Sequence, residues 1–237
     1  MNTHNANITI QSNFATSENT VILPTGLRNH INLLVFVHFL FFAWYLLSGP
    51  SGLSSQYLSD GTLNDFVNYD LTAAYSLQEF KWQSFTSIFT YQFVHLNAGE
   101  FILSISMLWL FGNLLRLKIG SLKTILLYFS FVALSALIYN LSHWVFPIFS
   151  GPRGILDGAF CGVLGIMTTT VFFYGKYQLH FYKNWTIALW KVYVVAILIS
   201  MVFVYEHNIA YIIVYISGIY LGIKSAEFIQ KSDRKLI

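Results

Sequence analysis

Charged residues are scarce in this sequence, and their scarcity excludes an ordinary soluble globular protein. Asp, Glu, Lys and Arg make up 10% of the 237 residues, against about 25% in soluble domains. Hydrophobic residues reach 56% and aromatic residues 18%. Cysteine is equally scarce, because Cys161 is the only one; this excludes an intrachain disulfide and a zinc site built from cysteines. The composition indicates an integral membrane protein.

Long apolar runs are abundant where charge is missing. Several of them approach the ~20 residues that cross the hydrocarbon core of a bilayer. Six such segments recur along the chain, at residues 31–48, 98–115, 122–142, 156–174, 188–205 and 209–227. The sequence therefore predicts an all-α membrane protein whose six transmembrane helices form one bundle.

Basic residues are distributed very unevenly among the predicted loops. Eleven of the 13 Lys and Arg residues fall on the side that holds both ends of the chain, and only Lys81 and Arg153 fall on the other. Cytoplasmic loops carry such an excess, so both termini are predicted to be cytoplasmic. The second, fourth and sixth helices would then run inward from the outer face. No basic run is interleaved with exposed aromatic residues, so we expect no nucleic-acid binding.

The charge and hydropathy pattern divides the chain into three parts. We expect residues 1–30 to form a flexible cytoplasmic tail, because they are polar and carry Pro24 and Gly26 near their end. They also lack the short apolar run of a removable signal peptide. Residues 31–227 form the predicted membrane domain, and residues 228–237 form a short basic cytoplasmic tail. Within the membrane domain, the outer loop 49–97 has an aromatic-rich second half, which is expected to lie partly in the membrane interface.

Four polar side chains stand out at the outer ends of the predicted helices. They are Glu100, Ser104, Asp157 and Tyr215. A charged side chain inside a bilayer costs roughly 2.5–3.5 kcal/mol on insertion scales, so the two carboxylates are candidates for a functional site. The two carboxylates and the tyrosine follow the start of inward-running helices by a few residues, which places them at a similar depth. We expect one outward-facing polar pocket.

Glycines at four-residue spacing accompany this predicted pocket. Small residues at this spacing let two membrane helices approach closely. The fourth and sixth helices each carry one such pair: Gly158 with Gly162, and Gly218 with Gly222. We expect these pairs to bring the fourth-helix carboxylate toward the sixth-helix tyrosine.

His38 lies within the first apolar segment. No second histidine occurs at ligand spacing inside the predicted helices, so we interpret His38 as a packing residue rather than a metal ligand. No metal and no cofactor are expected.

Four stretches, in order along the chain, resemble the rhomboid family of intramembrane serine proteases. Residues 89–95 (FTYQFVH) are similar to that family's approach to its second helix, and residues 107–112 (MLWLFG) resemble the Leu-x-x-Phe-Gly end of that helix. Residues 158–165 (GAFCGVLG) are similar to the tail of the fourth-helix signature, and residues 218–222 (GIYLG) resemble the end of the sixth helix. The resemblance implies a six-helix rhomboid-like bundle.

The sequence departs from the family at every position of the protease site. Aligned on the glycines, the nucleophilic serine is replaced by Asp157 and the general-base histidine by Tyr215. Glu100 and Ser104 stand where the family's histidine and asparagine bind the oxyanion. A phenol with a pKa near ~10 is a poor base at neutral pH. A carboxylate beside the developing oxyanion would oppose its stabilisation.

These departures favour a pseudoprotease, a catalytically inactive rhomboid-like protein that binds the transmembrane segments of client membrane proteins. Four alternatives remain open for the site. The pair formed by Glu100 and Asp157 could share a proton and activate water, or bind a divalent cation. One carboxyl could instead be protonated and merely hydrogen-bonded. A serine endopeptidase would follow only from a different alignment of the motifs. The expected partners are client transmembrane segments and the lipid bilayer, and the expected location is the cell membrane.

Overall fold

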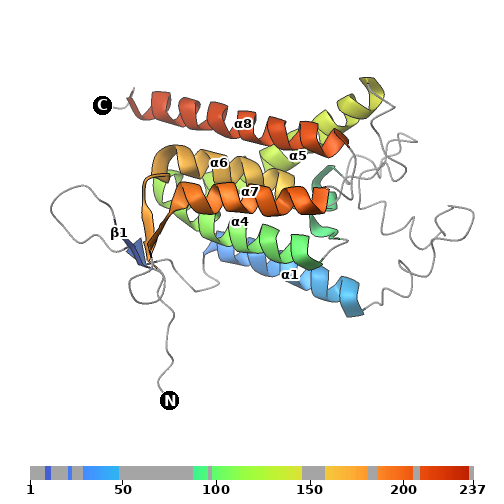
Figure 1. Ribbon diagram of the computed structural model, residues 1–237, viewed down its shortest axis with the longest axis horizontal. Coiled ribbons are helices and arrows are strands. Elements are labelled where there is room, and N and C mark those ends of the chain that lie inside the picture. The colour runs from blue at the N-terminus through green and yellow to red at the C-terminus, as the bar shows by residue number, and fades with distance from the viewer. Residues whose placement is uncertain are drawn as a thin grey trace, which may run out of the picture.

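Helices dominate the computed structural model of the protein. The structure describes residues 9–11, 21–22, 29–47, 88–95, 98–145, 158–180, 186–204 and 209–234. Its helices are α1 (His30–Leu47), the short 3-10 helix η1 (Tyr91–Phe93), α4 (Ala98–Ile119), α5 (Ser121–Val145), α6 (Phe160–Tyr174), α7 (Leu189–Val204) and α8 (Ile209–Arg234). The long helices lie side by side along a common direction, with α1 at one edge and α8 at the opposite edge (Figure 1).

The long helices coincide with the apolar segments of the sequence. Three of them are long and apolar enough to cross a membrane, over Ala98–Ile119, Ser121–Tyr139 and Tyr211–Arg234. Three shorter apolar helices cover His30–Trp44, Phe160–Tyr174 and Leu189–Val202. Large apolar side chains remain exposed along the bundle, as a lipid-facing surface requires. The prediction of a mainly helical membrane protein is confirmed, and the count of six spans stays a prediction.

Four short strands, which the all-α prediction did not include, form a small antiparallel sheet. They are β1 (Thr9–Gln11), β2 (Val21–Ile22), β3 (Gln178–His180) and β4 (Thr186–Ala188), in the order β2-β1-β3-β4. Strands of two or three residues are too short to show the alternation that identifies a strand in a sequence. Because β3 and β4 join α6 to α7, the sheet connects the N-terminal part of the chain to that end of the bundle.

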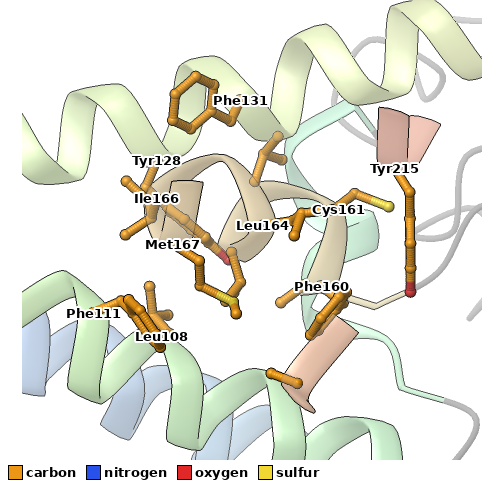
Figure 2. Close-up of a cluster of buried hydrophobic side chains, with 14 of the residues drawn as sticks. Leu108, Phe111, Tyr128, Phe131, Phe160, Cys161, Leu164, Ile166, Met167 and Tyr215 are labelled. Carbon is orange, nitrogen blue, oxygen red and sulfur yellow. The ribbon is translucent and has the colours of Figure 1, made fainter. Parts of the chain in front are cut away.

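Helix α6 is the centre of the bundle. Its first eleven residues, Phe160 to Thr170, are all buried, and Figure 2 shows its side chains enclosed by those of α4, α5 and α8. Its three threonines donate their hydroxyl hydrogens to carbonyl oxygens one turn earlier, at 2.7–2.8 Å. Each of these three hydroxyls therefore has a partner inside the protein, as a low-dielectric interior favours.

The glycines predicted to pack the fourth and sixth helices contact different neighbours. Gly218 and Gly222 of α8 do face α6, where the Cβ of an alanine at 222 would lie 2.6 Å from the Thr168 Cβ. Gly162 instead faces α5, because an added Cβ would lie 2.6 Å from Val132 Cγ2. The expected contact of Gly158 and Gly162 with α8 is thus corrected, since Gly162 packs on α5 and Gly158, which precedes α6, lies against Glu100 of α4.

A cluster of asparagines and a tight turn attach α1 and α5 to α4 at the end opposite the predicted pocket. Near the start of α1, the Asn29 amide donates to Asn113 of α4, and the Asn113 amide donates to Asn32 at 3.0 Å. Between α4 and α5 the chain turns at Gly120 alone, with a φ of 86°. Glycine adopts this left-handed conformation without the steric cost that other residues incur. The Gly120 carbonyl accepts hydrogen bonds from the main chain and side chain of Thr124.

Candidate functional site

The candidate site lies where the chain enters α6. Gly158 has a φ of 78°, so it cannot belong to a right-handed helix. Its N–H donates to the Val94 carbonyl at 2.7 Å, and the next N–H, of Ala159, donates to His95 Nε2 at 3.3 Å. Helix α6 consequently begins at Phe160. The predicted start at residue 156 is corrected, and Gly158 precedes the helix.

Glu100 lies directly against this entry. Its side chain is only 4% exposed. A Cβ placed on Gly158 would overlap the Glu100 Oε1 atom and lie 3.1 Å from the carboxyl carbon. The bare glycine therefore provides the space that the carboxyl group occupies. Asp157, the second carboxylate of the predicted pair, lies outside the described residues.

Ser104 lies one turn after Glu100 on α4, and it is fully buried. Residues four apart share a helix face, so Ser104 follows Glu100 along the side of α4 that packs on α6. Its Oγ has no hydrogen-bond partner among the residues that the structure describes. A buried hydroxyl without a partner costs free energy, so this atom is a position where a bound polar group would be favourable.

Tyr215 approaches the same entry from the opposite side. It is buried on α8, and the centre of its ring lies 5.3 Å from that of Phe160, the first residue of α6. Figure 2 shows the tyrosine extending past Cys161 toward the start of α6. The structure thus places Glu100 and Tyr215 at the same end of α6, on different neighbouring helices. Both belong to the set that the sequence indicated.

Two histidines, which the sequence analysis did not connect, meet beside this entry. The rings of His38 and His95 lie 6.1 Å apart, centre to centre, and His38 Nε2 is 3.1 Å from the Tyr128 hydroxyl. His38 also packs on the Phe93 ring at 4.6 Å. His38 is therefore a packing residue with a hydrogen bond, and it joins α1 to α5 and to the segment that holds Gly158.

The hydrogen bond from Ala159 identifies which ring nitrogen of neutral His95 carries the proton. Because Nε2 accepts this bond, the neutral ring carries its proton on Nδ1. Burial lowers the pKa of the His95 side chain from 6.5 to about 4, and a hydrogen bond with the Phe93 main chain opposes part of that effect. A second proton on Nε2 would remove the acceptor that holds the entry to α6.

We expect the protein to lose stability on acidification because of His95. The unfolded chain binds a proton near pH 6.5 and the folded chain near pH 4; stability is therefore full above pH 6.5 and declines as the pH falls toward 4. Between pH 7 and pH 5 the titration of this histidine should lower the free energy of unfolding by roughly 2 kcal/mol. Detergent unfolding at several pH values measures the loss. A His95→Gln variant keeps an acceptor but does not titrate, and an unchanged pH dependence in that variant would contradict the assignment.

The described residues of the site do not assemble a serine protease. No serine and histidine are hydrogen-bonded to each other around the α6 entry among the described residues, where Ser104 is near Glu100 and His95 accepts from the main chain. The described residues also contain no group of three or more His, Cys, Asp or Glu side chains that could hold a metal ion. What the site offers is a buried carboxyl group and a hydroxyl beside a main-chain turn.

Comparison with protein-family models identifies the family of the chain. The family model described as the Rhomboid domain matches residues 82–228, well over half of the chain. The match includes η1, α4, α5, α6 and α7 and most of α8, and therefore the whole candidate site, whereas α1 precedes it. No curated protein matches the chain. The order of the motifs, the central glycine-rich α6 and the match of the family model lead to one conclusion: the chain belongs to the rhomboid family.

Proposed function

We propose that this protein is a pseudoprotease of the rhomboid family, which binds transmembrane segments of client membrane proteins without cleaving them. The observation that carries the proposal is the position of Glu100. Its buried carboxyl group fills the space between α4 and the entry to α6. A peptide carbonyl under attack would need hydrogen-bond donors at such a position, whereas a carboxylate only accepts.

The weak attachment of α7 supports client binding. Among the described side chains of α7, only Leu189, Ala196 and Ser200 are buried, and the other side chains are exposed or half-buried. Ala196 and Ser200 form a small-residue seam, and one hydrogen bond of 3.0 Å joins Tyr193 to Thr168 of α6. A helix held along one narrow seam can separate from its neighbours at low cost, and a client helix could enter between α7 and α4.

The proposal includes a topology. The three long and three shorter apolar helices would all cross the bilayer, with both termini in the cytoplasm and the predicted pocket near the outer face. The cell membrane is the proposed location. In this arrangement a client segment reaches the site from within the bilayer.

Photo-crosslinking in native membranes tests client binding. A photo-reactive residue at Ile102 of α4 or Ile197 of α7 should capture membrane proteins, and mass spectrometry should locate the adduct in a transmembrane segment of a full-length client. The same residue at Leu126, which is exposed on α5, serves as the matched control. Equal capture from all three positions, or adducts confined to soluble domains, would contradict the proposal.

The absence of cleavage is tested in the same membranes with a serine-reactive phosphonate. We expect no covalent label, because the Ser104 hydroxyl is not hydrogen-bonded to any histidine among the described residues. Labelling that disappears in a Ser104→Ala variant would show an active serine and would overturn the inactive assignment. An Asp157→Asn variant completes the test, since loss of a client cleavage in that variant would instead favour the carboxylate alternative.

A further inference from the structure

One end of the bundle carries all the Lys and Arg residues that the structure describes. This basic end is where α4, α6 and α8 finish and where α5 and α7 begin. Its eight cationic residues are Arg116, Lys118, Lys123, Lys176, Lys191, Lys224, Lys231 and Arg234. The described carboxylates there are Glu227 and Asp233, and the remaining described carboxylate, Glu100, lies near the opposite end. Eight positive and two negative charges leave the described part of the basic end with a net charge of +6.

Most of this charge has no partner within the described part of the protein. Lys118 forms an ion pair with Asp233 at 2.6 Å, and Lys224 forms one with Glu227 at 2.9 Å. The other six cationic residues have no described carboxylate within ion-pair distance. Lys123, Lys176, Lys191 and Lys231 are exposed as well. The surface thus concentrates unneutralised positive charge that an external anion could bind.

Aromatic rings beside these cations indicate what kind of anion the surface meets. The ammonium groups of Lys191 and Lys224 lie 5.7 Å and 5.8 Å from the ring centres of Trp190 and Tyr220. These two rings are 47% and 58% exposed. Exposed Trp and Tyr rings under cationic groups are typical of the headgroup region, where a ring contacts lipid chains and the ammonium reaches the phosphate layer. A soluble polyanion would leave the rings in water.

We propose that the basic end binds the headgroups of acidic phospholipids in the leaflet that it faces, and so retains acidic lipids around the protein in preference to zwitterionic ones. The attraction acts on the leaflet as a whole and requires no client. It therefore goes beyond the proposed pseudoprotease function and does not depend on it. A Lys or Arg near an acidic membrane surface raises binding by about fivefold, so a few unpaired lysines are sufficient for a measurable preference.

The preference can be measured with spin-labelled lipids. The full chain is reconstituted in phosphatidylcholine vesicles that contain trace spin-labelled phosphatidylglycerol or spin-labelled phosphatidylcholine. The motionally restricted fraction of each probe gives their relative association constants. We expect phosphatidylglycerol to associate several-fold more strongly, and we expect the ratio to fall toward one in about 1 M salt, where the Debye length is ~3 Å. Equal association of the two probes at low salt would overturn the proposal.

Matched variants identify the residues responsible. Replacing Lys123, Lys176, Lys191 and Lys231 together with Gln should reduce the ratio to near one, whereas replacing the same four with Arg should preserve it. A ratio unchanged in the Gln variant would contradict the assignment to this surface. Free glycerol phosphate at millimolar concentration tests whether the surface binds soluble phosphate rather than lipid. Displacement of the labelled phosphatidylglycerol by this compound would show a phosphate site and would contradict the proposal. Should the Gln variant fail to fold, the salt titration of the unmodified protein decides alone.

Discussion

A Gly158→Ala variant is expected to unfold with a free energy about 3 kcal/mol lower than that of the unmodified protein. Two costs contribute. An L-residue with a φ of 78° incurs roughly 1–2 kcal/mol of backbone strain. The new methyl group would also overlap the Glu100 carboxyl group, which is almost fully buried and would have to shift. Reversible unfolding in mixed detergent micelles, followed by circular dichroism, measures the change.

Gly120 provides a control for the backbone term alone. Its φ is 86°, but nothing lies within 4 Å of an added Cβ. A Gly120→Ala variant should therefore lose only about 1 kcal/mol. The steric term is isolated by adding Glu100→Ala to the Gly158→Ala variant, because removing the carboxyl group should restore part of the lost stability. Equal losses at the two glycines would show that the contact between Glu100 and Gly158 does not shape the entry to α6.

A Gly222→Ala variant is expected to lose about 3 kcal/mol, although alanine is normally the better helix former by about 1 kcal/mol. The reversal follows from the contact with α6. The new Cβ would lie 2.6 Å from Thr168 Cβ and 2.8 Å from the Gly165 carbonyl oxygen. These atoms belong to, or adjoin, the main chain of α6, so α8 would have to move away. The hydrogen bond of 3.1 Å from Thr169 to the Gly222 carbonyl would be lost with it.

Gly218 is the matched position one turn earlier on the same helix. There an added Cβ would lie 3.2 Å from the Cys161 carbonyl oxygen and 3.7 Å from Leu164. A Gly218→Ala variant should change stability by less than about 1 kcal/mol, since the small displacement opposes the gain in helix propensity. The same detergent unfolding compares both variants. If Gly222→Ala were as stable as Gly218→Ala, α8 would not pack on α6 as closely as the structure shows.

The helices were predictable because a membrane-spanning segment is identified by its own composition. The run predicted at residues 31–48 is His30–Leu47, and that predicted at 209–227 begins at Ile209. No contact with the rest of the chain is needed to recognise a run of this length and apolarity. The structure extends α8 to Arg234 instead of the predicted 227, because the helix continues through the polar residues 230–234 (QKSDR) beyond the apolar segment.

The entry to α6 could not be predicted in the same way. The sequence around Gly158 is apolar and rich in glycine, so its composition fits a helix as well as a turn. Hydrogen bonds to Val94 and His95, more than sixty residues earlier, hold the turn. Tertiary contacts of this kind override local propensity. From helix direction and length the sequence predicted Glu100 and Asp157 at a similar depth. The structure places the Glu100 carboxyl group against Gly158, and Asp157 lies outside the described residues, so the predicted pair stays a prediction.

The histidine pair shows a similar limit. His38 was interpreted as a single packing residue because a search by ligand spacing considers one helix at a time. Its partners, His95 and Tyr128, lie on two other segments of the chain. A polar residue in an apolar helix needs a partner in the folded protein. The sequence could therefore indicate that His38 has a polar partner, but it could not indicate which residue the partner is.

The single-residue turn at Gly120 constrains how the bundle can change shape. Two helices of more than twenty residues are connected there by a single residue, and hydrogen bonds from Thr124 to the Gly120 carbonyl hold the turn. A displacement of α4 must therefore carry the near end of α5 with it. No such tight turn connects α7 to α4. Any widening of the space between α7 and α4 therefore depends on movement of α7, while α4 and α5 move together as one unit.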